Sequence, residues 1–142
     1  MTFDYIIVGA GSAGCVLANR LSSDSGIRVL LIEAGPEDKA LSLKMPAAML
    51  TNLNGRTHNW AYPGDPEPGL DGRQLRHDRG KTLGGSSSIN GMVFIRGHEL
   101  DFEGWRQSGC EGWGYADVLP YFKRMETYDG GADAYRGGDG PL

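Results

Sequence analysis

Cysteine is scarce in this sequence of 142 residues, which contains only Cys15 and Cys110. The two form no C-x-x-C pair and have no spacing typical of metal ligands, so the sequence predicts no metal site. We expect Cys15 to be a small buried residue of the first helix and Cys110 to be a loop thiol. This use of cysteine fits a reducing cytoplasm.

Long hydrophobic runs and an excess of positive charge are also missing. No run of 18 or more apolar residues occurs, so no segment is expected to span a bilayer. The formal charge of −4 argues against a general affinity for nucleic acid or anionic membranes. Because residues 1–4 enter a strand at once, they leave no room for a secretory leader. We expect one domain at most, located in the cytoplasm, with peripheral membrane association left open.

Glycine is abundant, and its first cluster follows an expected strand at Tyr5–Val8 in the order G-x-G-x-x-G. Gly9 permits a tight turn, Gly11 lets the backbone approach a pyrophosphate, and Gly14 lets the next helix pack closely on the strand. That helix, expected over Cys15–Leu21, would direct its free N–H groups and the positive end of its dipole toward the phosphates. The pattern predicts an anion site at the start of the helix.

A second apolar strand, expected over Ile27–Ile32, ends at Glu33. A carboxylate at this distance from the glycines can hydrogen-bond a ribose 2′-hydroxyl and would repel a 2′-phosphate. The stretch from Tyr5 to Glu33 therefore predicts an adenine dinucleotide other than NADP. An ordinary βαβ unit with an acidic strand end is the alternative.

Residues 37–79 show no βαβ period. Met45–Leu50 is typical of a short helix that starts at a proline. Turn-forming Pro and Gly fill residues 63–72, and Arg73–His77 follows, which predicts a hairpin-like excursion. The excursion is either a lid over a bound ligand or a surface insertion.

The second glycine cluster, Gly80–Gly97, is typical of another anion-binding turn. It is not a P-loop, because Lys81 precedes the glycine pair instead of following it. We expect a helix over Ser86–Ile95, although Gly91 inside it costs about 1 kcal/mol relative to alanine. A glycine in that position favours something flat or bulky against the backbone, and a plain packing contact is the alternative.

The remaining residues predict helices and a glycine-rich end. Asp101 is expected to cap a helix over residues 102–106. The amphipathic stretch Tyr115–Thr127 predicts another helix, with Pro120 tolerable only in its first turn. Residues 129–142 close no element.

Together the two glycine-rich stretches resemble the N-terminal part of a glucose–methanol–choline (GMC) flavoprotein oxidoreductase. Residues 4–14 with Glu33-Ala34-Gly35 resemble the adenosine-diphosphate site of that family, and residues 80–97 resemble its first signature. Residues 87–97 are most similar to the branch of choline dehydrogenases and bacterial medium-chain alcohol dehydrogenases. The resemblance runs from Tyr5 to Leu142. It implies an α/β fold with a Rossmann-like βαβ core, a loop or hairpin excursion, additional helices and an incomplete sheet.

The resemblance also implies an FAD enzyme that oxidises the CH–OH group of a small-molecule alcohol by hydride transfer to the flavin. Some relatives attach FAD covalently through a histidine, and Ile89 stands in that position, so non-covalent FAD is expected. One departure is His77-Asp78, where relatives usually have an aromatic residue and a proline. By carry-over, the pyrophosphate contacts Gly9, Gly11, Ser12, Ala13 and Gly14, the adenosine ribose lies at Glu33 and Ala34, the phosphate and ribityl side at Thr82, Gly84, Gly85 and Ser86, and the isoalloxazine at Asn90, Gly91 and Val93.

Members of this family are several hundred residues long, and their catalytic histidine lies near the C-terminus. We therefore expect residues 1–142 to be the N-terminal part of the FAD-binding domain, without the substrate domain and the catalytic segment. His58, His77 and His98 match no catalytic position of the family, so no catalytic residue is assigned here. A non-catalytic flavin-binding protein and an NAD-dependent Rossmann dehydrogenase are the alternatives. The identity of the alcohol and the electron acceptor stay open.

Overall fold

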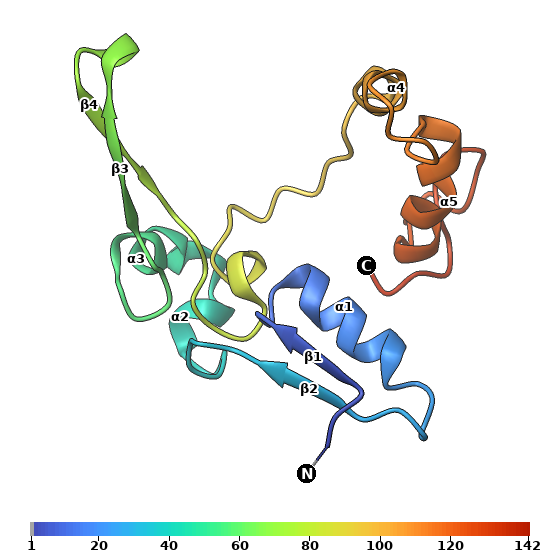
Figure 1. Ribbon diagram of the computed structural model, residues 1–142, viewed down its shortest axis with the longest axis horizontal. Coiled ribbons are helices and arrows are strands. Elements are labelled where there is room, and N and C mark those ends of the chain that lie inside the picture. Colours follow the sequence, from blue (N-terminus) through green and yellow to red (C-terminus); the bar gives the residue numbers. More distant parts are fainter. Residues whose placement is uncertain (1) are drawn as a thin grey trace. The chain divides into compact units, whose positions relative to one another are not determined.

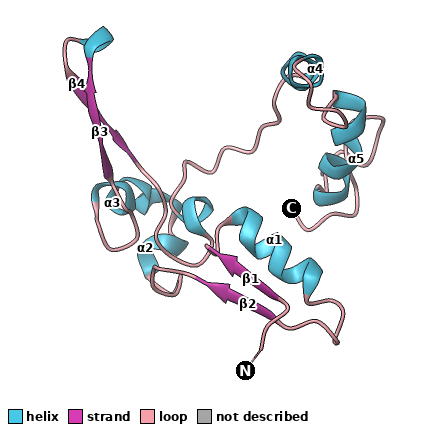
Figure 2. Ribbon diagram, viewed as in Figure 1, coloured by secondary structure: helices cyan, strands magenta, loops and turns pink. Residues whose placement is uncertain are grey.

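The structure is a computed structural model that describes residues 2–142 (Figure 1). The chain forms two compact units, Met1–Val93 and Phe94–Leu142. The first contains all the strands among the described residues, and the second contains helices joined by irregular segments (Figure 2).

The first unit begins with a βαβ element. Strand β1 (Tyr5–Val8) and strand β2 (Val29–Ile32) are parallel neighbours, paired from Tyr5 with Val29 to Val8 with Ile32. Helix α1 (Ser12–Leu21) connects them and packs on both. Parallel strands need such a crossover, and β-branched residues favour the pleated conformation. The expected α/β fold class is confirmed, although α1 starts earlier and β2 later than the sequence predicted.

Among the described residues, this parallel sheet has two strands. Part of its apolar surface is open to solvent, with Ile6 61% and Val8 83% exposed. Sheets of this class are normally covered on both faces. The expected incomplete sheet is therefore what the structure has.

Short helices and a hairpin follow. Helix α2 (Leu41–Lys44) leads to a 3₁₀ turn at Pro46–Ala48 and to helix α3 (Met49–Asn54), so a helix does start at the proline. Strands β3 (Tyr62–Glu67) and β4 (Arg73–His77) then pair antiparallel, joined by a 3₁₀ turn at Pro68–Leu70. The predicted hairpin is confirmed, and a shift in its register occurs between Pro63 and Pro66, which cannot donate ladder hydrogen bonds.

The base of the hairpin is held by Asn59, which is 1% exposed. Its amide nitrogen donates to the Asp78 carboxylate at 2.7 Å, and its carbonyl oxygen accepts from the backbone N–H groups of Ala61 and Arg79. The hydrogen bond from Asn59 is the main cause that lowers the pKa of Asp78, and Arg76 adds to the shift. Asp78 therefore replaces the expected proline with a charged hydrogen-bond acceptor.

The helix expected over Ser86–Ile95 is wrong. Only a 3₁₀ turn forms, at Gly85–Ser88, and the chain then runs on without regular structure to His98. The side chain of Asn90 accepts a hydrogen bond from the N–H of Met92 at 2.8 Å, and Met92 takes a φ of 58°, which ends any helix there. Gly91 within the same turn weakens the helical alternative further.

The second unit contains helices α4 (Glu99–Gln107) and α5 (Tyr115–Met125). His98, not Asp101, caps α4: its Nδ1 accepts from the N–H of Leu100, while Asp101 accepts from the N–H of His98. The expected Asp101 cap is therefore wrong, because this carboxylate takes the second role of a capping box. Helix α5 continues through Pro120 beyond its first turn, which also differs from the expectation.

An ion-pair network closes the second unit around Glu126, which is 4% exposed. Its carboxylate accepts from Arg96 at 2.6 Å, from Arg136 at 2.9 Å and from the N–H of Gly137. Burial opposes ionisation of Glu126, but the hydrogen bonds from Gly137 and Arg136 and the two arginine charges outweigh it and lower its pKa. The guanidinium of Arg96 also lies over the ring of Phe122.

Both cysteines are free and exposed. The expectation that Cys15 is buried is thus wrong: its side chain is exposed at the start of α1, where the thiol donates to the carbonyl of Ala10 at 3.3 Å. Among the described residues, no group of His, Cys, Asp and Glu could hold a metal ion. None of the described helices is long and apolar enough to cross a membrane.

Candidate cofactor site

The first glycine turn has the geometry that close packing of a helix on a strand requires. Gly9 has a φ of 98°, and its N–H donates to the carbonyl of Ile32 at 2.7 Å. A Cβ at Gly14 would overlap the carbonyl oxygen of Gly9. Only glycine at position 14 therefore lets α1 start so close to the end of β1.

The N-terminus of α1 is open for an anion. Gly11 is its N-cap and supplies no side-chain hydrogen bond, and the first turn contains no acidic residue. The first N–H groups of a helix have no intrahelical partner, so those of Ser12, Ala13 and Gly14 are available to a ligand. A Cβ at Gly11 would meet no atom within 4 Å, so space for a close approach exists there. These features fit a pyrophosphate.

The Glu33 carboxylate is fixed beside this turn. Its Oε2 accepts from the N–H of Ala10 at 2.8 Å, and its Oε1 accepts from the N–H of Gly35 at 2.9 Å. A carboxylate oxygen can accept more than one hydrogen bond, so both oxygens retain capacity for ribose hydroxyls. Ala34 follows with an exposed side chain. The arrangement fits the adenosine end of a dinucleotide.

The second glycine stretch packs directly on the first. The N–H of Gly84 donates to the carbonyl of Ala10 at 2.8 Å, and Gly84 forms a parallel bridge with Gly11. A Cβ at Gly85 would lie 2.8 Å from the Cα of Gly11. Gly84 and Gly85 have φ angles of 86° and 56°, which favour glycine. The structure thus brings together the two stretches that are far apart in sequence.

Thr82 and Ser86 stabilise this turn through hydrogen bonds. Thr82 is fully buried, and its hydroxyl donates to the carbonyl of Pro36 at 2.8 Å. The hydroxyl of Ser86 accepts from the N–H of Gly80 at 3.0 Å. The Thr82 hydroxyl is therefore committed to the loop and not free for a ligand, whereas Ser86 is exposed and only accepts in this contact.

Asn90, Gly91 and Val93 continue the same segment, and all three are exposed. The Oδ1 of Asn90 accepts from the N–H of Met92, which leaves its amide N–H₂ as the free polar group. Val93 is 77% exposed, so nothing in the first unit covers it. This end of the site offers an amide donor, bare backbone and an apolar side chain.

Two structural glycines of this site were not predicted. A Cβ at Gly35 would overlap the backbone of Lys81, and a Cβ at Gly80 would overlap that of Gly85. Both positions fix how the stretch after Glu33 packs against the second glycine turn. In the sequence each is only a glycine beside a turn, and this does not predict a contact with residues far away in the chain.

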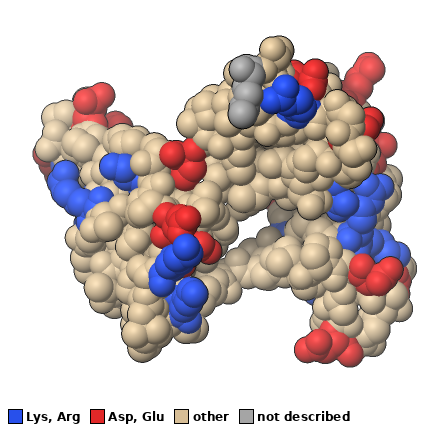
Figure 3. Space-filling model, turned by 90° about the horizontal axis from the view of Figure 1, so that it is seen from below, with Lys and Arg blue, Asp and Glu red and all other residues tan. Residues whose placement is uncertain are grey.

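Acidic and basic side chains are mixed on the face that Figure 3 draws. Among the residues assigned to the cofactor, Glu33 carries the only formal charge.

Comparison with known proteins agrees with this geometry. Residues 3–141 match the family described as GMC oxidoreductase. The chain belongs to the GMC oxidoreductase family. The resemblance inferred from the two glycine stretches is thereby confirmed.

Relatives of this GMC chain include an oxygen-dependent choline dehydrogenase of Vibrio vulnificus, 56% identical over 140 residues that cover 99% of this chain and 25% of that protein. Pyridoxine 4-oxidase from Mesorbium loti has a similar structure, with a TM-score of 0.92 and 43% identity over 99% of this chain and 28% of the other. A formate oxidase variant of Aspergillus oryzae RIB40, studied for FAD modification, gives a TM-score of 0.81 at 32% identity, over 99% and 26% of the two chains. The chain thus spans about a quarter of the length of the curated relatives it matches.

Proposed function

We propose that residues 1–142 form the N-terminal part of the FAD-binding domain of an oxidoreductase that oxidises the CH–OH group of an alcohol. The observation that supports this most directly is the packing of Gly84 and Gly85 on Gly11, beside the uncapped start of α1 and the Glu33 carboxylate. A nicotinamide-dependent Rossmann enzyme needs only the first glycine turn and the acidic residue. The second glycine turn therefore favours FAD over a nicotinamide dinucleotide.

In this proposal the diphosphate lies at the start of α1. The backbone at Gly9 and Gly11 leaves room for it, and the N–H groups of Ser12, Ala13 and Gly14 donate to its oxygens. The adenosine ribose donates to Glu33, next to Ala34. Since Ala10 and Gly35 already orient the Glu33 carboxylate, little side-chain entropy is lost on binding.

The riboflavin half then follows the second glycine stretch. Gly84, Gly85 and the backbone at Thr82 and Ser86 would line the ribityl side, and Asn90, Gly91 and Val93 would contact the ring system. Ile89 is 3% exposed and has no nucleophilic atom, so it offers no covalent attachment. Non-covalent FAD is therefore part of the proposal.

The residues of this chain bind and orient, and FAD when bound would supply the acceptor for the hydride that leaves the alcohol carbon. His77 lies in β4 opposite Tyr62, the carbonyl of His58 accepts from the N–H of Lys81, and the Nδ1 of His98 caps α4. We assign none of the three as the base. We assign the proton acceptor to the part of the enzyme beyond the quarter that this chain covers.

The names of the relatives favour choline or another small alcohol as substrate, and the proposal covers both. The acidic composition and the free cysteines favour a cytoplasmic location. A non-catalytic flavin-binding protein is the alternative that the cofactor site alone also fits.

Absorbance spectroscopy of the purified full-length enzyme that contains residues 1–142 tests this proposal. We expect a flavin spectrum, and we expect acid precipitation to release FAD into the supernatant because nothing tethers it. Anaerobic addition of an alcohol substrate should bleach the flavin as it is reduced. A colourless protein that binds NADH would refute the proposal, and flavin that stays in the pellet would refute the non-covalent assignment.

A further inference from the structure

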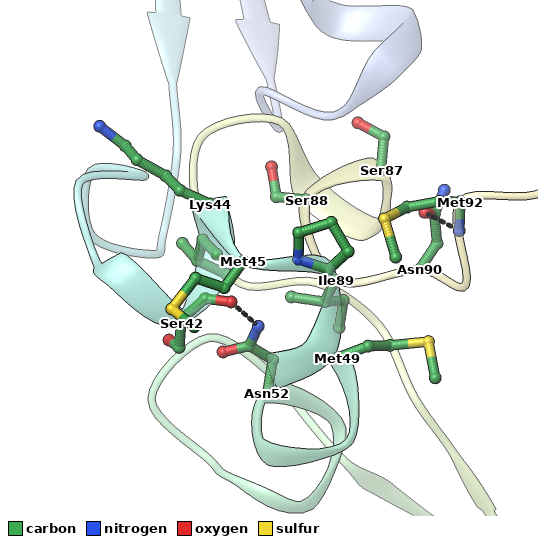
Figure 4. Close-up of a pocket in the computed structure, with 12 residues that line it drawn as sticks. Ser42, Lys44, Met45, Met49, Asn52, Ser87, Ser88, Ile89, Asn90 and Met92 are labelled. Carbon is green, nitrogen blue, oxygen red and sulfur yellow. Dashed lines mark hydrogen bonds between the residues drawn. The ribbon is translucent and has the colours of Figure 1, made fainter.

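Residues 90–95 form an exposed span of chain that contains the proposed contacts to the flavin ring, Asn90, Gly91 and Val93. The span belongs to no helix or strand. Within it the Oδ1 of Asn90 accepts from the N–H of Met92, and Figure 4 draws this hydrogen bond as a dashed line. Because no helix or sheet ladder fixes these residues, their order depends on how the two ends of the span are held.

The first end of the span is held at Ile89, which belongs to the second glycine stretch. Ile89 is 3% exposed and lines the small cavity that Figure 4 draws. Its N–H donates to the carbonyl of Ser86 at 3.2 Å, at the end of the 3₁₀ turn. This anchor is therefore part of the cofactor site already described.

The other end of the span is held at Arg96, whose side chain is 12% exposed. Its Nη2 donates to the Glu126 carboxylate at 2.6 Å, and its Nη1 donates to the carbonyl of Tyr135. Its guanidinium also lies 5.3 Å from the centroid of the Phe122 ring. Within the second unit, Arg96 thus ties the end of the span to α5, to the C-cap of that helix and to the loop that follows.

The distance from this anchor to the proposed flavin contacts is short. Val93 and Arg96 are three residues apart in the sequence, so their Cα atoms lie at most about 11 Å from each other in any conformation of the chain. Groups that bind a ligand must be held within about 0.5 Å of their productive positions. Release of Arg96 therefore gives freedom to residues that need to be ordered.

A buried ion pair of this kind is better suited to fixing geometry than to adding stability. Removing two charges from water costs several kcal/mol for each ion, and their attraction offsets this cost only when the geometry is good. The fork of Arg96 makes two directed hydrogen bonds, to Glu126 and to the carbonyl of Tyr135, from acceptors on different segments. An apolar residue could fill the space, but it could not hold the backbone in this directed way.

We propose that Arg96 is a positioning residue for the flavin. By fixing the end of the span, its hydrogen bonds to Glu126 and Tyr135 order Asn90, Gly91 and Val93 for contact with the ring. The inference rests on the proposed function and goes beyond it, because it assigns a role in cofactor binding to an ion pair outside the cofactor site. Arg96 acts through the span.

Arg136 offers a matched control. It pairs with the same Glu126 carboxylate at 2.9 Å, but from the loop after α5 and not from the span. Arg96→Gln and Arg136→Gln therefore each remove one guanidinium from Glu126 and leave the other in place. Only the first substitution releases the span.

The pair is compared in the full-length flavin-loaded enzyme by readouts that need no substrate. These are the visible spectrum of the bound flavin, the dissociation constant of FAD, and the midpoint potential from stepwise dithionite reduction against a reference dye. We expect Arg96→Gln to change the spectrum and the potential, because hydrogen bonds to the ring tune its electronics. FAD binding should weaken about tenfold, equivalent to one lost hydrogen bond. Arg136→Gln should leave the spectrum unchanged and the dissociation constant within about twofold, since its half-exposed ion pair contributes little.

Glu126→Gln separates position from charge. It leaves the charge of Arg96 in place but removes the acceptor that holds it. If Arg96 acts by position, Glu126→Gln should weaken FAD binding and change the flavin spectrum in the same way as Arg96→Gln. If only the charge at residue 96 matters, the two substitutions should move the midpoint potential in opposite directions, which would overturn the inference.

Stability is controlled by recording melting curves and by measuring every variant well below its transition. If Arg96→Gln does not retain flavin through purification, Arg96→Lys and Arg136→Lys give the same comparison with the charge kept, because a lysine cannot reproduce the two directed hydrogen bonds. Variants of Arg96 that alter the flavin no more than those of Arg136 would overturn this inference alone. A native enzyme that never carries flavin would overturn the proposed function and this inference with it.

Discussion

Gly14 is the residue at which helix packing and cofactor binding meet. A Cβ there would overlap the carbonyl oxygen of Gly9, so Gly14→Ala must displace α1 or the turn. We expect destabilisation of about 1–3 kcal/mol, as for other overpacked sites. Because the displaced helix start no longer fits a diphosphate, we also expect the affinity for FAD to fall, measured by quenching of flavin fluorescence.

Gly104 provides the matched control for this substitution. It lies inside α4, where a Cβ would meet no atom within 4 Å. Gly104→Ala should therefore be neutral or stabilise the protein by about 0.5–1 kcal/mol and leave FAD binding unchanged. Equal loss of FAD affinity in both variants would show that the close contact at Gly14 is not the cause.

Glu33 is predicted to contribute to FAD affinity through its charge. Glu33→Gln keeps the shape but places an N–H₂ group against one of the two backbone donors, Ala10 or Gly35. Hydrogen bonds to a charged group contribute about 1.5–3 kcal/mol, so the dissociation constant of FAD should rise by roughly tenfold to a hundredfold. Isothermal titration calorimetry of FAD into the apoprotein measures this dissociation constant. Glu37→Gln, at an exposed surface ion pair with Lys39, serves as control, and a similar change there would contradict the assignment.

At the scale of the element, the hairpin β3–β4 is predicted to loosen in acid. Asp78 at its base has a pKa below its ordinary value of 3.8, chiefly because Asn59 donates to it. The ionised form therefore stabilises the folded hairpin above that value, and the contribution is lost as the pH falls through the lowered pKa. We expect amide exchange in residues 62–77, corrected for the intrinsic pH effect, to accelerate in this range. Asp78→Asn should remove the pH dependence, and protection that stays constant in the native chain would contradict it.

Local signals explain which elements the sequence predicted correctly. The βαβ core and the hairpin were predicted from apolar strand runs flanked by Gly and Pro. These signals act over only a few residues. The helix over Ser86–Ile95 failed because the serines bond to nearby carbonyls and Asn90 bonds to Met92, which is not visible from hydrophobic spacing. The contact between Gly85 and Gly11 also lies beyond local reasoning, and only the resemblance to a family indicated it.

The cofactor residues also divide into those whose conformation depends on local sequence and those whose conformation depends on distant contacts. The local geometry at Gly9, Gly14 and Glu33 was predictable because it follows from one βαβ unit, and their contacts with a cofactor stay predictions. Thr82 was expected beside the ligand, yet its hydroxyl is buried against Pro36, since a side chain's direction depends on packing from a distant segment. For Asn90, Gly91 and Val93 the structure shows exposed positions, and their contact with a flavin stays a prediction.

At the scale of the whole molecule, the last prediction concerns residues 1–142 taken alone. Strand β1 has a partner on one side only, and Ile6 and Val8 are 61% and 83% exposed. Apolar surface and a free strand edge of this kind promote association, so we expect aggregation or weak FAD binding and a broad thermal transition. We also expect no oxidation of any alcohol with an artificial electron acceptor, because we assign the proton acceptor to a part of the enzyme outside these residues. A sharp two-state melt would contradict the first expectation. Turnover by these residues alone would show that the proton acceptor lies within them after all.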